Sequence, residues 1–343
     1  MQDKEIKKSK ALVLFSGGLD SILAVKTLEA QNIDVTAICF KSNFFNENQA
    51  KKSAEDFNIK LIVKDIGDKF LEVVKNPPSG YGKNLNPCID CHALMAQEAF
   101  QIMKDGDYDF LASGEVLGQR PFSQNKNALE QVEKKSGLEI LRPLSAKLLL
   151  ETEVEKKGLV KRGLLHRIKG RGREDQMDLA LKYKINKYPS PAGGCILTDP
   201  EFSSRMIKML SFWPECNTKD IELLKSGRIF WLKLKEKKEE NILIVVGRHK
   251  EDNAKLLSLA QKGDFMVELK DINGPITLVR QKNNLEEIYE NEYEIEGPKK
   301  LLDIDLKLKN NFKDILISAG FLTAFYSPKA RGLKLKISII KNG

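Results

Sequence analysis

Short apolar runs alternate with segments of helical periodicity through the first third of the chain. The first run, ALVLF, is continuously apolar, as expected of a parallel strand that is covered on both faces. The predicted strands are residues 11–15, 34–40, 60–66 and 108–115, and the predicted helices between them are residues 21–30, 50–59 and 92–104. Because strands that alternate with helices build βαβ units, the pattern predicts an α/β fold with a doubly wound parallel sheet.

The pattern changes in the second half of the chain. After the segment GLEILRPL, residues 137–144, the chain is predicted to become helical and basic over residues 154–175. Beyond residue 200 the predicted strands are residues 227–235, 241–248, 264–270 and 275–280, with an edge strand at 332–340. We therefore expect an α/β domain over residues 1–200, a linker over 201–220 and a smaller α+β domain over 221–343.

Composition narrows the class of protein. Uninterrupted apolar stretches stay well below the roughly 20 residues of a membrane span, and the polar start MQDKEIKKSK leads directly into the first strand. We therefore expect a cytoplasmic protein with no membrane partner. The net charge of +9 favours polyanionic partners, nucleic acid above all, although lysine-rich composition alone also produces such an excess.

The segment SGGLDS, residues 16–21, has the features of an anion-binding turn. Gly17 and Gly18 are expected to adopt backbone angles closed to other residues, and the first turn of the following helix offers unpaired N–H groups. Ser16 and Ser21 add hydroxyl donors. Asp20 would repel a bare phosphate, which suggests a bridging Mg²⁺. The sequence lacks the GK[ST] of a P-loop and the GxGxxG of a dinucleotide site.

SGGLDS after the first strand resembles the PP-loop of the ATP pyrophosphatase superfamily, whose members adenylate a substrate and release pyrophosphate. Residues 111–147, LASGEVLGQRPFSQNKNALEQVEKKSGLEILRPLSAK, are similar to the corresponding part of tRNA 4-thiouridine synthetases. The resemblance covers about residues 10–200 and implies an adenine nucleotide alpha hydrolase-like fold. It also implies that Gly114 and the turn ending at Gln119 lie beside ATP, and that the main chain at Phe40 contacts adenine.

Arg142 follows a predicted strand, and two interpretations of it stay open: a phosphate or RNA contact, or a surface salt bridge.

The cysteines suggest sulfur chemistry. Cys88 and Cys91 form a CxxC pair, and Cys195 lies in the glycine-flanked segment PAGGC. This trio resembles the thiolating enzymes that hold a [4Fe-4S] cluster by three cysteines, which implies a catalytic and metal-binding role for all three. Other interpretations are structural zinc with His92, c-type haem at CIDCH, a persulfide-carrying cysteine with a resolving partner, or buried small hydrophobes. The last fits Cys39 and Cys216.

A basic stretch, residues 156–173, is a candidate RNA contact, although a solvated helix face would look the same. Its proposed RNA-binding side chains are Lys161, Arg162, Arg167, Lys169, Arg171 and Arg173. The C-terminal module loosely resembles the RNA-binding domain of NFACT-type ribosome-associated proteins. There Trp231 and Phe230 are candidates for base stacking, with one of them expected in the core.

Together these features predict an ATP-dependent tRNA sulfurtransferase, with 4-thiouridine as the favoured product. Its implied ligands are ATP, Mg²⁺, a [4Fe-4S] cluster and tRNA, with sulfur supplied as sulfide or as the persulfide of a cysteine desulfurase. The alternatives are a cluster-free tRNA 2-thiouridylase of the persulfide type, an ATP-dependent synthetase acting on a small molecule, and a non-catalytic RNA-binding protein. The target uridine and a homodimeric state stay open.

Overall fold

The chain forms two compact units, Met1–Ser203 and Ser204–Gly343, in a computed structural model. The structure describes residues 8–189, 194–234, 240–282, 291–304, 306, 309 and 311–343. The boundary falls within helix α8 (Pro200–Phe212), and α9 (Thr218–Leu223) follows. The segment expected to be a linker thus carries two helices. Among the described residues, no helix combines the length and the apolar character that a membrane crossing requires.

The first unit contains the predicted parallel sheet. Its strands are β1 (Lys10–Leu14), β2 (Asp34–Lys41), β3 (Lys60–Asp65), β4 (Phe110–Ser113) and β5 (Ile140–Leu141). They are hydrogen-bonded in the order β3-β2-β1-β4-β5, and all four pairings are parallel. The chain therefore winds outward from β1 in both directions, which confirms the doubly wound α/β fold.

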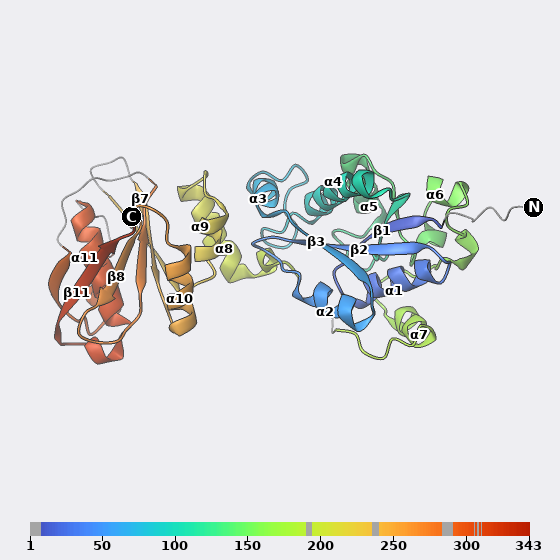
Figure 1. Ribbon diagram of the computed structural model, residues 1–343. Helices are drawn as coiled ribbons and strands as arrows, with labels where there is room; N and C mark the ends of the chain where they lie inside the picture. Colours follow the sequence, from blue (N-terminus) through green and yellow to red (C-terminus); the bar gives the residue numbers. More distant parts are fainter. Residues whose placement is uncertain are drawn as a thin grey trace, which may run out of the picture. The chain divides into compact units, whose positions relative to one another are not determined.

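Helices cover both faces of this sheet (Figure 1). One face carries α1 (Leu19–Glu29), α2 (Asn48–Asp56) and α7 (Glu174–Lys182), and the other carries α3 (Gly67–Lys75), α4 (Cys88–Gly106) and α5 (Lys126–Ser136). The core is built from the strands and the inner faces of these helices, with Val13, Ile22 and Ala37 completely buried. Burial on both faces explains why the strands are continuously apolar.

Residues 154–175 do not form the continuous helix that the sequence predicts. Only α6 (Glu153–Lys156) and a 3₁₀ turn at Arg162–Leu164 are helical before α7 begins at Glu174. Gly158 and Gly170 adopt φ values of 72° and 82°, in the left-handed region, and such residues interrupt a right-handed helix. The basic stretch therefore runs as an irregular segment along the surface.

The second unit is built on an antiparallel sheet, as the α+β prediction requires. Its strands are β6 (Arg228–Lys233), β7 (Asn241–Val246), β8 (Phe265–Leu269), β9 (Thr277–Arg280), β10 (Glu292–Glu296) and β11 (Lys334–Lys341), in the order β10-β11-β8-β9-β7-β6. Helix α11 (Phe312–Phe325) packs on β8 and β9, and α10 (Lys250–Leu259) packs on β9 and α9. The remaining short 3₁₀ helices are Ala146–Leu148, Ile196–Thr198, Leu301–Asp303 and Pro328–Ala330.

The functional edge of the first unit lies where the winding direction reverses. β1 and β4 are hydrogen-bonded neighbours although nearly a hundred residues separate them, so the loops that follow them meet. The contact is between backbones: a Cβ atom built on Gly114 would lie 2.6 Å from the Asp20 carbonyl oxygen and 2.7 Å from the Ser21 Cα. Ligands of open parallel sheets bind at this switch point, beyond the carboxyl ends of the strands.

This contact generates a first prediction. Gly114→Ala should lower the free energy of unfolding by about 1–3 kcal/mol, because the added methyl group meets backbone atoms that cannot rotate away. Gly163→Ala is the matched control, since a Cβ built there meets no described atom within 4 Å. Urea unfolding followed by circular dichroism measures both. Equal stability of the two variants would contradict the tight contact.

Candidate active site

The SGGLDS turn connects β1 to α1 in a conformation that exposes backbone N–H groups. Gly17 has a φ of 77°, and a Cβ atom there would lie 2.5 Å from the Gln49 carbonyl oxygen, so only glycine fits. The Ser53 hydroxyl donates to the Gly17 carbonyl oxygen at 2.8 Å and fixes the turn against α2. Gly18 differs from the expectation: it is extended, with φ −77°, and its role is that of N-cap for α1.

Several buried polar atoms gather around this turn without partners. Asp20 Oδ1, Gln49 Nε2 and both amide atoms of Gln176 make no hydrogen bond with any residue that the structure describes. Gln49 borders both glycines of the turn. Because buried polar groups are nearly always hydrogen-bonded in folded proteins, this group of orphaned atoms fits the binding of a polar ligand such as ATP.

Asp20 lies between neutral and cationic side chains. Burial raises the pKa of its carboxyl, while the Gln119 amide, Arg173, the Gln176 amide and Arg120 lower it, and the rise prevails. Gln119 therefore lies beside the turn, and its predicted place beside ATP stays a prediction. A carboxylate oxygen without a described partner, at the start of a helix, fits a ligand for Mg²⁺.

The loop after β4 is fixed on several sides. Leu117 N–H donates to the Ser145 hydroxyl at 3.0 Å, and Gly118 N–H donates to the Gln124 carbonyl oxygen at 2.7 Å. Gly114 stands against Asp20, as described above. At the end of β2, Phe40 is 5% exposed and lies in register with β3. Its predicted main-chain contact with adenine stays a prediction.

A buried ion network lies behind this loop. Glu115 contacts His92 Nδ1 at 2.9 Å and Arg142 Nε at 3.2 Å, and the Arg142 guanidinium also pairs with Glu133. Burial alone would raise the pKa of Glu115, but His92 and Arg142 lower it to about 2. Arg142 is 4% exposed and pairs with Glu115 and Glu133, so the salt-bridge interpretation is right except that the bridge is buried rather than at the surface. A phosphate or RNA contact of Arg142 stays a prediction.

The three sulfur candidates meet at the start of α4. The helix begins at Cys88, four residues before the predicted start, so the CxxC pair occupies its first turn, and the Cys88 thiol donates to Asn86 Oδ1 at 3.1 Å. The Cys195 segment is held there by backbone bonds, since Leu85 N–H donates to the Leu197 carbonyl oxygen at 3.3 Å. Residues 190–193, which precede Cys195, lie outside the described residues.

The thiols are close enough to influence one another. Burial raises the pKa of Cys91 well above its ordinary value, and the neighbouring Cys195 and Cys88 raise it further. Burial also raises the pKa of Cys88, and Arg120 opposes that rise. Arg120 therefore lies within electrostatic reach of both the thiols and Asp20.

Cys88, Cys91 and Cys195 are candidate ligands of a metal ion or an iron–sulfur cluster. Three cysteines at one helix end supply thiolate ligands for an iron–sulfur cluster or for zinc. In the part of the chain that the structure describes, no three His, Cys, Asp or Glu side chains stand in a metal-binding arrangement. The trio has the side-chain chemistry of cluster ligands but does not stand in a metal-binding arrangement here, and the cluster stays a proposal. The remaining cysteines, Cys39 and Cys216, are buried, as the small-hydrophobe interpretation expects.

The basic stretch passes beside the loop after β4. Gly170 N–H donates to the Leu117 carbonyl oxygen at 2.8 Å, which ties the stretch to the loop after β4. The exposed members of the predicted RNA set are Lys161, Arg167, Lys169 and Arg171. Arg162 instead pairs with the buried Glu155 at 2.6 Å, and Arg173 lies beside Asp20. The predicted RNA contacts stay a prediction.

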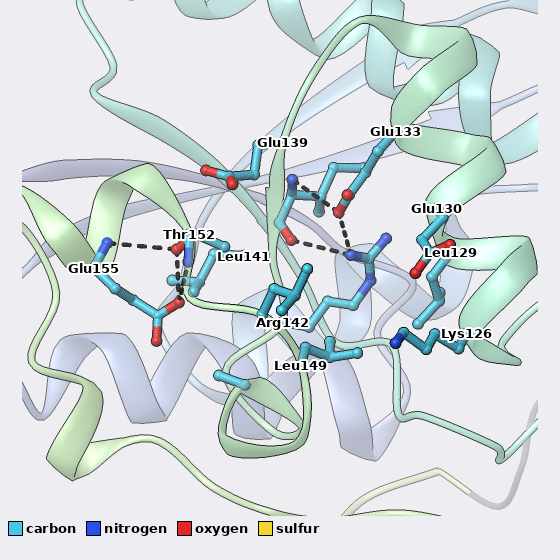
Figure 2. Close-up of a pocket in the computed structure, with 13 residues that line it drawn as sticks. Lys126, Leu129, Glu130, Glu133, Glu139, Leu141, Arg142, Leu149, Thr152 and Glu155 are labelled. Atoms are coloured by element: carbon cyan, nitrogen blue, oxygen red, sulfur yellow. Dashed lines mark hydrogen bonds and ion pairs between the residues drawn. The ribbon is translucent and has the colours of Figure 1, made fainter.

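A separate cavity of about 150 Å³ lies next to β5 and α5 (Figure 2). Two of its carboxylates have partners: Glu133 pairs with Arg142, and Glu155 accepts hydrogen bonds from Thr152. Its volume falls below the ~300 Å³ at which ligand pockets begin. We interpret it as a packing defect beside the buried ion network.

The first unit is similar to several known proteins. Residues 7–147 match the family described as "Thiamine biosynthesis protein (ThiI)". This segment is therefore similar to the ThiI-family domain. A tRNA-specific 2-thiouridylase MnmA of Treponema denticola is 35% identical over 120 residues, which cover 31% of this chain and 32% of that protein. A probable tRNA sulfurtransferase of Methanosarcina mazei is 30% identical over 122 residues, covering 33% and 29%.

A solved 4-thiouridine synthetase–RNA complex with bound ATP is also similar, at 20% identity and a TM-score of 0.34, over 52% of each chain. The chain spans less than half the length of the curated relatives it matches. The resemblance to an NFACT-type module in the second unit stays a prediction.

The sequence analysis missed several residues that lie around the SGGLDS turn. Gln49, Gln176 and Arg120 come from three different elements, and only the fold brings them to Asp20 or the turn. The pairing of Glu115 with Arg142 was also missed, although both flank strands that are adjacent in the sheet. A charged residue at the end of each neighbouring strand was the available signal.

The low pKa of Glu115 generates a second prediction. A carboxyl whose folded pKa is about 2, against an ordinary 4.5, adds stability above pH 4.5 and loses it as the pH falls toward 2. Glu115→Gln should lower the free energy of unfolding by about 3 kcal/mol at pH 7. The difference from the unsubstituted protein should shrink steadily between pH 4.5 and 2.

Urea unfolding at pH 7, 4.5 and 3 measures this difference. Glu130→Gln is the control, because Glu130 is exposed, and it should stay within about 0.5 kcal/mol at every pH. A Glu115→Gln difference that does not vary with pH would contradict the assignment.

Proposed function

We propose that this protein is an ATP-dependent tRNA sulfurtransferase that adenylates a uridine carbonyl oxygen and replaces that oxygen with sulfur. The observation that carries the proposal is that polar groups suited to binding ATP and thiols suited to sulfur transfer lie in the same unit. Orphaned polar atoms surround the Gly17–Asp20 turn, thiols converge at the start of α4, and Arg120 acts on Asp20 and on Cys88. Substrates held at the two places would be neighbours.

In the first stage the turn holds ATP. The N–H groups of the first turn of α1 are directed toward its phosphates, and no side chain that the structure describes caps that helix end. Ser16 is exposed beside them, and Asp20 would hold Mg²⁺, which neutralises phosphate charge. The uridine carbonyl oxygen attacks the α-phosphorus, and pyrophosphate leaves with the electron pair of the broken P–O bond.

In the second stage sulfur displaces AMP. Adenylation turns a poor leaving group, the carbonyl oxygen, into a good one. Cys88, Cys91 and Cys195 would hold a [4Fe-4S] cluster, which supplies an open iron site for hydrosulfide. The chain orients this site: the start of α4 presents the CxxC pair, Asn86 fixes Cys88, and the Glu115–His92 pair fixes the residue next to Cys91.

The persulfide route is the second candidate, because the 2-thiouridylase of T. denticola is among the relatives. There a cysteine persulfide attacks the adenylated carbon and AMP leaves. A second thiol then attacks the resulting disulfide, thiouridine is released, and a dithiol reductant restores the cysteine pair. The adjacency of Cys88, Cys91 and Cys195 suits this chemistry as well.

The tRNA is proposed to lie along the basic stretch. Its exposed cations can neutralise phosphates without reading sequence, and the Leu117–Gly170 bond brings the stretch to the nucleotide loop. 4-Thiouridine is the favoured product because the 111–147 segment resembles enzymes that make it. A reducing compartment that contains tRNA, the cytoplasm, suits the reduced thiols.

The second unit is proposed as an additional RNA contact. Trp231 packs edge-on against Phe212 and Trp213, with ring centroids 5.0 and 4.9 Å apart, and both Trp231 and Phe212 stay partly exposed. Lys208 and Lys233 lie over the Phe212 ring. Phe230 packs against the hydrophobic core, so Trp231 is the better candidate for base stacking.

A third prediction tests the reaction. Asp20→Asn should reduce thiolation of tRNA at least about hundredfold, because it removes a charge that would hold the metal at the reacting phosphates. Purified protein is incubated anaerobically with ATP, Mg²⁺, sulfide and tRNA, and the nucleosides are quantified by mass spectrometry. Cells that lack the gene should lose 4-thiouridine. Unchanged thiolated nucleosides in those cells would refute the proposal, and loss of 2-thiouridine instead would select the other product.

A fourth prediction separates the two sulfur routes. Protein purified anaerobically should contain about four irons and four sulfides per chain. Cys88→Ser, Cys91→Ser and Cys195→Ser should each lose the cluster and the thiolation activity, whereas Cys39→Ala should keep both. If iron is absent from active protein, and one of the three cysteines can be replaced without loss, the persulfide route is correct.

A further inference from the structure

The first turn of α7 lies beside the SGGLDS turn, residues 16–21, and has no role in the proposed reaction. α7 packs against α1, the helix that begins at the SGGLDS turn (Figure 1). Its N-cap is Arg173, which makes no side-chain capping hydrogen bond with a described residue. The free N–H groups of this helix end are therefore available to an anion.

Gln176, in the first turn of α7, supplies an independent sign of a ligand. Its side chain is 0% exposed, and neither its Nε2 nor its Oε1 has a hydrogen-bond partner among the residues described. The amide approaches Asp20, whose Oδ1 is also without a described partner. A buried amide without partners is costly, so a ligand that accepts a hydrogen bond from the Gln176 Nε2 belongs beside this side chain.

The charges around Asp20 identify the chemistry of that ligand. Arg173 and Arg120 both act on the Asp20 carboxyl, so two cations border the place that Gln176 faces. The first-turn carboxylates of α7, Glu174 and Asp175, are exposed to solvent, whereas Gln176 is buried. Two guanidinium groups, an amide donor and two helix N-termini suit a doubly charged phosphate group.

We propose that the first turn of α7 forms the second wall of the nucleotide site, where Arg173 and Gln176 bind the outer phosphates of ATP opposite the Gly17–Asp20 turn. The inference rests on the ATP-binding part of the proposed function. It assigns Arg173 to the nucleotide, and leaves the exposed members of the basic stretch to tRNA. After adenylation, the same residues hold the departing pyrophosphate.

Equilibrium binding of three probes tests the assignment. Arg173→Ala should weaken the binding of Mg·ATP and of inorganic pyrophosphate about tenfold, because each loses a charge-assisted hydrogen bond. Binding of AMP, which lacks the outer phosphates, should change less than about twofold. Lys182→Ala is the matched control: it removes one positive charge from the last turn of the same helix, and Mg·ATP binding should stay within about twofold.

Gln176→Leu provides a second variant that separates binding from folding. Replacing an unpartnered buried amide with an apolar side chain of similar size should leave the melting temperature unchanged or raise it. Mg·ATP binding should nevertheless weaken about tenfold. A variant that melts at a lower temperature and binds ATP normally would show that Gln176 is structural, and would overturn its assignment.

The outcome for Arg173 is equally decisive. If Arg173→Ala weakens tRNA binding in a filter assay while Mg·ATP and pyrophosphate bind normally, the residue serves RNA and the inference is wrong. These results are distinct from a failure of the proposed reaction. If the protein binds ATP with the predicted variant effects but forms no thiolated nucleoside, the sulfurtransferase proposal is wrong. The assignment of Arg173 and Gln176 to the ATP site is then still supported.

Discussion

The proposed site in the first unit depends on a tight contact between the backbones that leave β1 and β4. Gly114 lies so near the Asp20 carbonyl oxygen that a side chain cannot be placed between them. Because β1 and β4 are adjacent parallel strands, their carboxyl ends must share one edge of the sheet. The SGGLDS turn and the loop after β4 therefore lie against each other, and this contact is possible only because residue 114 has no side chain.

From that contact, a short chain of interactions leads to the thiols. Glu115 follows Gly114 directly, and its carboxylate holds His92, the residue after Cys91. Arg142 and Glu133 complete the network from β5 and α5. A buried network of this kind is rigid only when all its members are present, since removal of one leaves an uncompensated charge. It thus fixes the start of α4 relative to the SGGLDS turn, which a reaction between the two requires.

The sequence predicted what local patterns encode. The alternation of apolar runs with helical segments was sufficient for the parallel sheet, and SGGLDS located the turn. Prediction from the sequence failed where the structure depends on contacts between residues that are far apart along the chain. α11 is apolar on nearly all sides, so it shows no helical periodicity. Within residues 154–175, the sequence does not reveal that Gly158 and Gly170 adopt left-handed backbone angles and interrupt the helix. Gln176 resembles any polar helix residue until the fold buries it.

The orphaned polar atoms also bear on how stability is distributed. A buried amide or carboxylate oxygen without a partner disfavours the folded state, and Asp20, Gln49 and Gln176 each contribute such atoms at one place in the described structure. Elsewhere in the described first unit Glu115 is paired with His92 and Arg142, and single atoms of Gln31, Gln124 and Arg142 are also without a partner. Selection for stability alone would replace the orphaned groups with apolar ones. Their retention at the carboxyl edge of the sheet is understandable if a ligand completes their hydrogen bonds, because the free energy lost in folding is then recovered on binding.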